Sequence, residues 1–69
     1  MNALTPRQDE AMRLVCRGVQ NKEIAAAMGL SVYTVKSAMM RAIFERLGVQ
    51  NRVEAVLVYL RQHPELLNV

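Results

Sequence analysis

The stretch NKEIAAAMGLSVYTVK, residues 21–36, most constrains what this chain can fold into. Ala25 precedes Gly29 by four residues and Gly29 precedes Val35 by six, which is the spacing of two short helices joined by a tight turn. A small Ala25 permits close helix approach, Gly29 can adopt the left-handed conformation that ends the first helix, and Val35 enters the core. Ser31 offers its hydroxyl as the N-cap of the second helix. The stretch therefore predicts a helix-turn-helix, a unit whose second helix can enter the major groove of DNA.

Helix start and stop signals divide the rest of the chain into further helices. Thr5 followed by Pro6, with Gln8 three residues after the threonine, predicts a capping box and a helix over 6–17 that Gly18 ends. The other helices are expected over 21–29, 32–46 and 51–62, with residues 1–3 frayed and 63–69 forming a C-terminal tail. In the third of these helices the apolar side chains recur every four positions, which predicts a core-facing stripe of Val35, Met39, Ile43 and Leu47.

Composition agrees with one small helical domain of 69 residues. Hydrophobic residues make up 52% of the chain, yet it has two Tyr, one Phe and no Trp, so the core is built from aliphatic side chains and Met. That composition favours packed helices over a sheet, and the expected fold is an all-α four-helix bundle containing the helix-turn-helix. Single Cys16 is expected to be a small core or boundary residue. No apolar run reaches the ~18 residues of a membrane span, so a cytoplasmic protein is expected.

The charge distribution leaves two interpretations open. The formal net charge is +3, and the cations in or after the helix-turn-helix outnumber the acidic residues there. Over residues 22–54 the cations are Lys22, Lys36, Arg41, Arg46 and Arg52, and the acidic residues are Glu23, Glu45 and Glu54. This surplus suits a polyanion such as DNA, and it equally suits a solvated basic face.

The last expected helix contains the run AVLVYL, residues 55–60, which has no polar position. We expect Val53, Val56, Leu57 and Leu60 to serve the core, which leaves the other side of the helix needing a cover. A second subunit is one cover, with a dimer interface of Ala55, Val58, Tyr59 and Gln62. The other is the tail, whose Leu66, Leu67 and Val69 would fold back over the helix.

From Leu4 to about Leu60 the chain resembles the LuxR/FixJ-type, or GerE-like, DNA-binding domain. The resemblance is carried by Leu4-Thr5-x-Arg7, Asn21-Lys22-Glu23-Ile24-Ala25, Ser31-x-x-Thr34-Val35-Lys36 and Leu47-Gly48-Val49-x-x-Arg52. It implies a four-helix bundle whose third helix enters the major groove and whose fourth helix forms a two-fold dimer. By this resemblance, Lys36 and Ser37 contact bases or phosphates, Thr34 and Ser31 contact phosphates, and Lys22 anchors the DNA backbone. The full set of candidate DNA contacts is Lys22, Ser31, Tyr33, Thr34, Lys36, Ser37, Met40 and Arg41.

Three positions depart from the family pattern. Gln20 stands where a serine is frequent, so the cap of the second helix is expected from Asn21 or from the Gln20 side chain. Ala38 stands where a histidine is common. Leu47 follows Lys36 by eleven residues, one more than the family pattern, so the third helix carries an extra residue. Such an insertion is expected to rotate the residues after it by about 100° around the helix axis.

These features predict a stand-alone transcription regulator that binds double-stranded DNA as a homodimer on a pseudo-palindromic site and associates with the nucleoid. The alternative is an interaction protein that pairs with a larger LuxR-type regulator and blocks it. An enzyme is not expected, because His63 is the single histidine and no catalytic spacing accompanies it. No cofactor, metal ion, small-molecule ligand or membrane partner is expected either.

Overall fold

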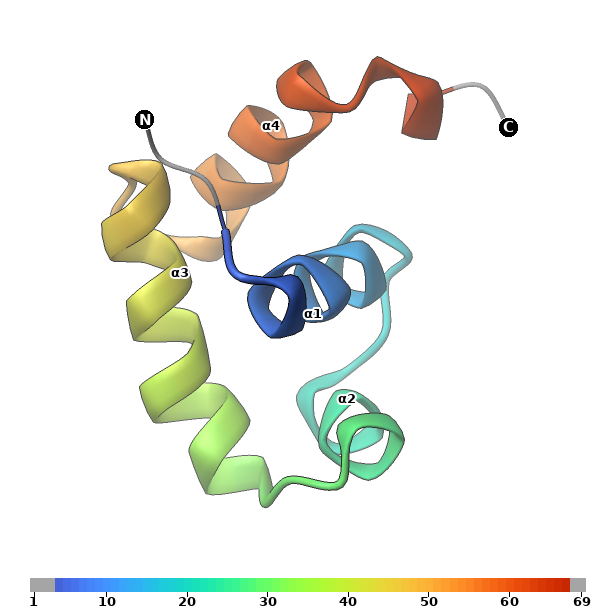
Figure 1. The fold of residues 1–69 in the computed structure, drawn as a ribbon, viewed down its shortest axis with the longest axis vertical. Coiled ribbons are helices and arrows are strands. Elements are labelled where there is room, and N and C mark those ends of the chain that lie inside the picture. The colour runs from blue at the N-terminus through green and yellow to red at the C-terminus, as the bar shows by residue number, and fades with distance from the viewer. Residues whose placement is uncertain (1–3, 68–69) are drawn as a thin grey trace.

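The computed structural model describes residues 4–67, and the regular structure in that range is entirely helical (Figure 1). The elements are α1 Pro6–Cys16, α2 Asn21–Met28, η1 Thr34–Met39, α3 Met40–Leu47, α4 Arg52–Gln62 and η2 Pro64–Leu67. The predicted all-α fold class is confirmed. The predicted fraying of residues 1–3 lies outside the described residues.

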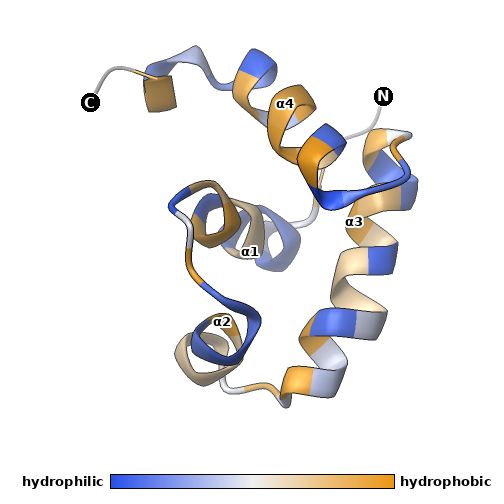
Figure 2. Ribbon diagram, turned by 180° about the vertical axis from the view of Figure 1, so that it is seen from behind, coloured by the Kyte–Doolittle hydropathy of each residue, from blue (hydrophilic) through white to orange (hydrophobic). Residues whose placement is uncertain are grey.

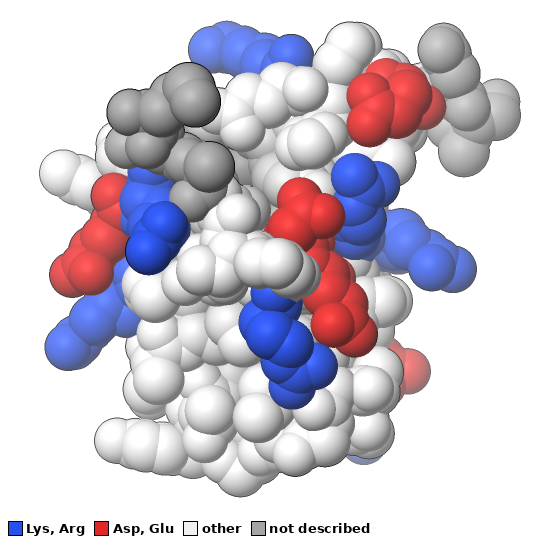
Figure 3. Space-filling model, in the orientation of Figure 1, with Lys and Arg blue, Asp and Glu red and all other residues white. Residues whose placement is uncertain are grey.

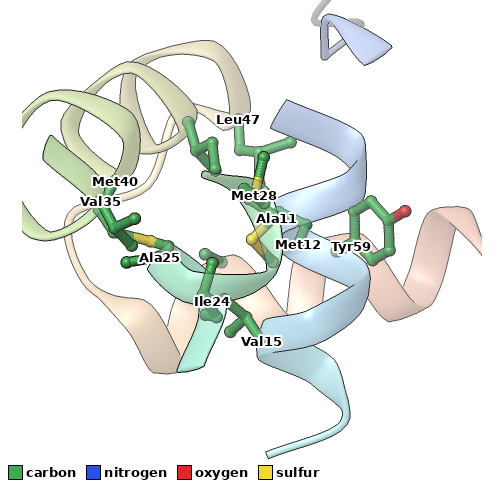
Figure 4. Packing of buried hydrophobic residues seen from close by; sticks show 12 residues of the cluster. Ala11, Met12, Val15, Ile24, Ala25, Met28, Val35, Met40, Leu47 and Tyr59 are labelled. Carbon is green, nitrogen blue, oxygen red and sulfur yellow. The ribbon is translucent and has the colours of Figure 1, made fainter. Parts of the chain in front are cut away.

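The core lies where four helical segments meet around α1. In Figure 1, α1 occupies the centre, α4 lies above it, α2 lies below it, and the long helix over residues 32–47 stands to one side. Helix α1 packs on both α2 and α4, while η1 packs on α2 and α3 packs on α4. Figure 4 shows the aliphatic and methionine side chains that fill this space. The buried residues are Ala11, Met12, Val15, Ile24, Ala25, Met28, Val35, Met40, Ile43, Leu47, Ala55 and Tyr59.

Two predicted helix ends are confirmed in detail. The Thr5 hydroxyl accepts a hydrogen bond from the Gln8 backbone N–H at 3.2 Å, and the Gln8 side chain accepts one from the Thr5 N–H at 3.0 Å. Gly29 ends α2 with φ 69°, and the Leu30 N–H then donates to the Ala25 carbonyl at 2.8 Å. A left-handed residue here reverses the chain, so the turn brings the next helix back against α2.

Of the two residues expected to cap α2, Gln20 stands at the N-cap and Asn21 has another role. Gln20 is the N-cap residue, and its N–H donates to the Glu23 carboxylate at 3.3 Å. The Asn21 side chain instead accepts a hydrogen bond from the Arg52 guanidinium at 2.7 Å, and Arg52 also donates to the Val19 carbonyl at 3.2 Å. Arg52 therefore ties the start of α4 to the start of α2, and this contact occupies the guanidinium that the charge count placed in a basic surface.

The third helix departs from regular α-helical geometry. Residues 32–47 form one continuous helix, but η1 within it is a π-helical segment. Met39 was predicted to face the core and packs partly buried against it, while the neighbouring Met40 is the buried residue. The wider turn takes up the extra residue, so Ile43 and Leu47 still face the core. The expected 100° rotation of the residues after the insertion is therefore wrong.

The most deeply buried residues of α4 are not the predicted ones, although Val56 packs partly buried against the core as expected. Ala55 and Tyr59 are fully buried, whereas Val53 and Leu57 are 70% and 53% exposed. The proposed dimer contacts Ala55 and Tyr59 are therefore wrong, because they belong to the domain's own core. The other two proposed contacts lie away from Val53 and Leu57 around the helix: Val58 packs partly buried against the core, and Gln62 is exposed beside Tyr59. Figure 2 shows that hydrophobic residues fill the middle of α4, so alternation with polar residues could not identify its core side.

A buried hydrogen bond explains which side of α4 faces inward. The Tyr59 hydroxyl donates to the Asp9 carboxylate on α1 at 2.5 Å, and the His63 ring stacks on Tyr59 with centroids 4.2 Å apart. A buried phenol needs such a partner. Burial, reinforced by Asp9, raises the pKa of Tyr59 well above its usual range. The hydrogen bond from Tyr59, helped by Arg13 at 3.0 Å, lowers the pKa of Asp9.

The tail does not cover the exposed side of α4. Leu66 in η2 packs against the core and lines a small hollow with Leu60 and Cys16. Leu67 remains 60% exposed, and Val69 lies outside the described residues. The apolar surface formed by Val53 and Leu57 is therefore uncovered in the part of the chain that the structure describes.

Candidate nucleic-acid interface

The leading end of the third helix is held by a pair of hydroxyl groups. The Ser31 hydroxyl accepts a hydrogen bond from the Thr34 N–H at 3.0 Å and donates to the Thr34 hydroxyl at 2.8 Å. This confirms Ser31 as the predicted N-cap. Tyr33, beside this cap, is 77% exposed, so its ring projects into solvent from the first turn. The predicted phosphate contacts of Ser31 and Thr34 stay predictions, and the Thr34 hydroxyl keeps its own proton to donate.

Four of the predicted DNA contacts line one hollow on the third helix, and three of them, Lys36, Ser37 and Arg41, are polar. Lys36, Ser37 and Arg41 contribute to a surface depression of about 450 Å³. Lys36 and Arg41 are both exposed, and Ser37 is partly buried between them. Lysine and arginine can donate to the O6 and N7 atoms of guanine, and all three residue types can donate to phosphate oxygens. The hollow thus places two cations and a hydroxyl group where a nucleic acid could reach them together.

Met40 is a wrong prediction as a DNA contact. Its side chain is only 5% exposed and points, with Val35, toward Ala25 of α2 (Figure 4). It also lines the hollow, together with the apolar side chains of Phe44 and Val49. An apolar lining of this kind excludes water from part of the contact surface. It does not supply a polar contact to a base.

Two polar residues of the hollow were missed by the sequence analysis. Gln50 lines its rim from the loop between α3 and α4, and Glu45 lines it from the helix. The loop lies there because Gly48 takes φ 71° and the Val49 N–H donates back to the Phe44 carbonyl at 3.0 Å. Gly48 stands just past the helix expected over 32–46, where a glycine is typical of a helix end. No feature of the sequence indicated that Val49 and Gln50 would then pack back along the same helix.

On the face drawn in Figure 3, acidic side chains interrupt the basic ones. Figure 3 shows Lys and Arg side chains projecting from the flank over α3, with an acidic side chain between them. Lys22 is exposed in the first turn of α2 and does not line the hollow. On α1, Arg7 donates to the Met28 carbonyl at 2.8 Å, so it joins α1 to the end of α2. Lys36 and Arg41 at the hollow, rather than the net charge of the chain, make this surface the candidate for DNA binding.

Within residues 4–67, no group of three or more His, Cys, Asp or Glu side chains is arranged to hold a metal ion. Over the same range, no helix has the length and apolar character needed to cross a membrane. Burial raises the pKa of the Cys16 thiol, which disfavours its reactive thiolate form.

Comparison with known proteins matches most of the chain. Residues 2–59 match a family described as "Bacterial regulatory proteins, luxR family". The response regulator protein VraR of Staphylococcus aureus (strain NCTC 8325 / PS 47) is 40% identical over 60 residues, which cover 87% of this chain and 28% of VraR. YhjB of Escherichia coli (strain K12) is 36% identical over 58 residues, covering 84% of this chain and 28% of YhjB. The chain thus spans about a quarter of the length of these relatives. No solved structure gives a significant match.

Proposed function

The chain belongs to the luxR family of bacterial regulatory proteins, and we propose that it binds double-stranded DNA as a homodimer and regulates transcription. The observation that carries this proposal is the hollow on the second helix of the helix-turn-helix, where Lys36, Ser37 and Arg41 come together. In this class of motif the second helix lies in the major groove and its leading residues contact base edges. The proposed contacts are Lys36, Ser37 and Arg41 in the groove, with Tyr33, Thr34 and Gln50 beside them and Lys22 on a phosphate.

Replacing Lys36 with Ala is expected to weaken DNA binding without loss of the fold. Lys36 is exposed and belongs to no core contact, so the substitution removes one donor to a base or phosphate. A base contact of this kind is worth roughly 1–3 kcal/mol. Binding would be measured by fluorescence anisotropy on a duplex selected by the parent chain, with helix content followed by circular dichroism.

Arg17→Ala is the matched control, since Arg17 is an exposed cation at the end of α1 and not a part of the hollow. It should leave the affinity close to that of the parent. Equal losses for both variants would mean that net charge alone attracts the DNA. An unchanged DNA affinity for Lys36→Ala would mean that the third helix does not contact the bases.

We assign the dimer contact to the outer side of α4, with Val53 and Leu57 at its centre. Both side chains are more than half exposed, and with Arg52 and Val56 they line a shallow hollow of about 320 Å³. Burying such side chains against a second copy stabilises at roughly 25 cal/mol per Å² of apolar area, less the entropy cost of association. A two-fold axis at α4 then places the two reading helices about one DNA turn, roughly 34 Å, apart, which requires a pseudo-palindromic site.

Leu57→Glu is expected to give a folded monomer that binds one half-site. The carboxylate would repel its own copy across the axis, and the side chain is not needed by the core. Leu57→Glu would lose the cooperative binding to two half-sites, and this loss is expected to be roughly 1–3 kcal/mol. Sedimentation velocity would measure the oligomeric state, and binding to full and half sites would measure the cooperativity.

Leu67→Glu provides the control, because Leu67 is 60% exposed but lies in η2 rather than on α4. It should sediment and bind as the parent does. A Leu57→Glu variant that keeps the parent's mass in solution would place the dimer contact elsewhere. If the parent chain binds no duplex at low salt but forms a stable complex with a larger luxR-type regulator, the interaction-protein alternative would replace this proposal.

A further inference from the structure

The third helix holds one residue more between two core contacts than a regular α-helix does. Val35 is fully buried and Met40 is 5% exposed, although they are five positions apart. The Met40 N–H donates to the carbonyl oxygens of Val35 and Ser37. Core-facing residues in a regular α-helix recur at a spacing of three or four. The additional residue must therefore lie on the exposed side, within the turn that carries Lys36, Ser37 and Ala38.

This π turn also determines which exposed side chains face the same way. Lys36 and Arg41 are five positions apart and line the same hollow. In a regular α-helix, residues five apart point about 140° away from each other. The wider turn removes most of that divergence, so a cation before the turn and a cation after it face one surface. Single π turns within α-helices are rare and occur frequently at functional sites.

We propose that the π turn sets sequence specificity by fixing the offset between Lys36 and Arg41 as they contact two base positions. Arg41 is thereby a specificity-determining residue, and its planar guanidinium suits the O6 and N7 atoms of guanine in the major groove. Ser37 lies within the turn and lines the hollow between the two cations. This inference rests on the proposed DNA binding. It adds that Arg41 distinguishes the second base position and that the π turn places Arg41 there.

Deletion of Ala38 tests the role of the turn while preserving the core. After the deletion, Met40, Ile43 and Leu47 stand four, seven and eleven positions after Val35, which is the spacing of a regular α-helix. The shortened chain is therefore expected to fold, with a melting temperature equal to or above that of the parent. Lys36 and Arg41 would then stand four positions apart in a regular α-helix, about 40° apart around the axis and about 6 Å apart along it. They would still face one side, but Arg41 would lie at a different offset from Lys36 than it does across the π turn.

The experiment is selection of duplexes from a random library by the parent, by the Ala38 deletion and by Arg41→Ala. For the parent we expect a guanine preference at the position contacted by Arg41. Arg41→Ala should relax that preference by roughly 5- to 150-fold while keeping the others. The Ala38 deletion should change the preference at the same position and keep the one that depends on Lys36. A chain with a second alanine inserted after Ala38 is the length control, and it should melt at a lower temperature because one turn cannot absorb two extra residues.

The outcomes separate this inference from the proposed function. A parent chain that binds no duplex at low salt overturns both. A parent chain that selects a site, together with an Ala38 deletion that folds and selects the identical site, overturns the role of the turn alone. An Ala38 deletion that does not fold overturns the register argument, and an Arg41→Ala variant with unchanged preferences overturns the assignment of Arg41.

Discussion

Val35→Asp is expected to abolish the folded domain. Val35 is fully buried, lies in the π turn and points toward Ala25 of α2. A carboxylate there would be desolvated with no cation or donor beside it, a change that costs several kcal/mol. A domain of this size has a total stability of roughly 3–10 kcal/mol. The far-ultraviolet circular dichroism spectrum should therefore lose most of its helical signal, and the cooperative melt should disappear.

Val32→Asp is the matched control for this substitution. Val32 lies in the first turn of the same helix and is 45% exposed, so its carboxylate would stay hydrated. An acidic residue at a helix N-terminus is also mildly favourable. The control should melt cooperatively near the parent temperature. If Val35→Asp melted like the parent as well, Val35 would not occupy the core position assigned to it.

Added salt is expected to weaken DNA binding by orders of magnitude. Lys22, Lys36 and Arg41 would place three cations per subunit, and about six per dimer, against phosphates, and each neutralised phosphate displaces condensed counterions. The expected slope of log affinity against log salt is then about −5, which is a loss of roughly 10³-fold between ~50 and ~200 mM salt. Anisotropy titrations on one selected duplex across that range would measure the slope.

The slope also has an internal check, because Leu57→Glu would bind as a monomer with half the cations. Its slope on a half-site should be close to half that of the parent. Lys36→Ala should lower the parent slope if Lys36 contacts a phosphate, and leave it unchanged if Lys36 contacts only a base. A parent slope near zero would contradict the electrostatic contribution of all three residues and would favour a protein partner.

The surface proposed to contact DNA could be predicted only in part from the sequence. The N-cap, the exposed Tyr33 and the grouping of Lys36 with Ser37 follow from residues close together in sequence. Gln50 could not be placed, because its position depends on a chain reversal at Gly48 that continues past the helix end. Arg41 could be proposed but not positioned, since its direction depends on how the inserted residue is accommodated.

Local chemistry determined the helices of this protein, and the sequence alone was sufficient for them. Thr5 with Gln8, Ser31, Gly29 and Gly48 define helix ends through hydrogen bonds and backbone conformations that involve neighbouring residues. Such interactions are short in range, so their partners can be read from the spacing in the chain. The same reasoning identified the all-α class and the helix-turn-helix.

Tertiary structure alone decided which sides of those helices are buried. Along α4, every position from 55 to 60 is apolar, so periodicity carried no information, and the Asp9 carboxylate on α1 selected the side that bears Tyr59. In the third helix, both Met39 and Met40 could fill the space beside Val35, and packing against α2 together with the π turn selected Met40. In each case the competing side chains are equally apolar, so the choice depends on partners distant in sequence.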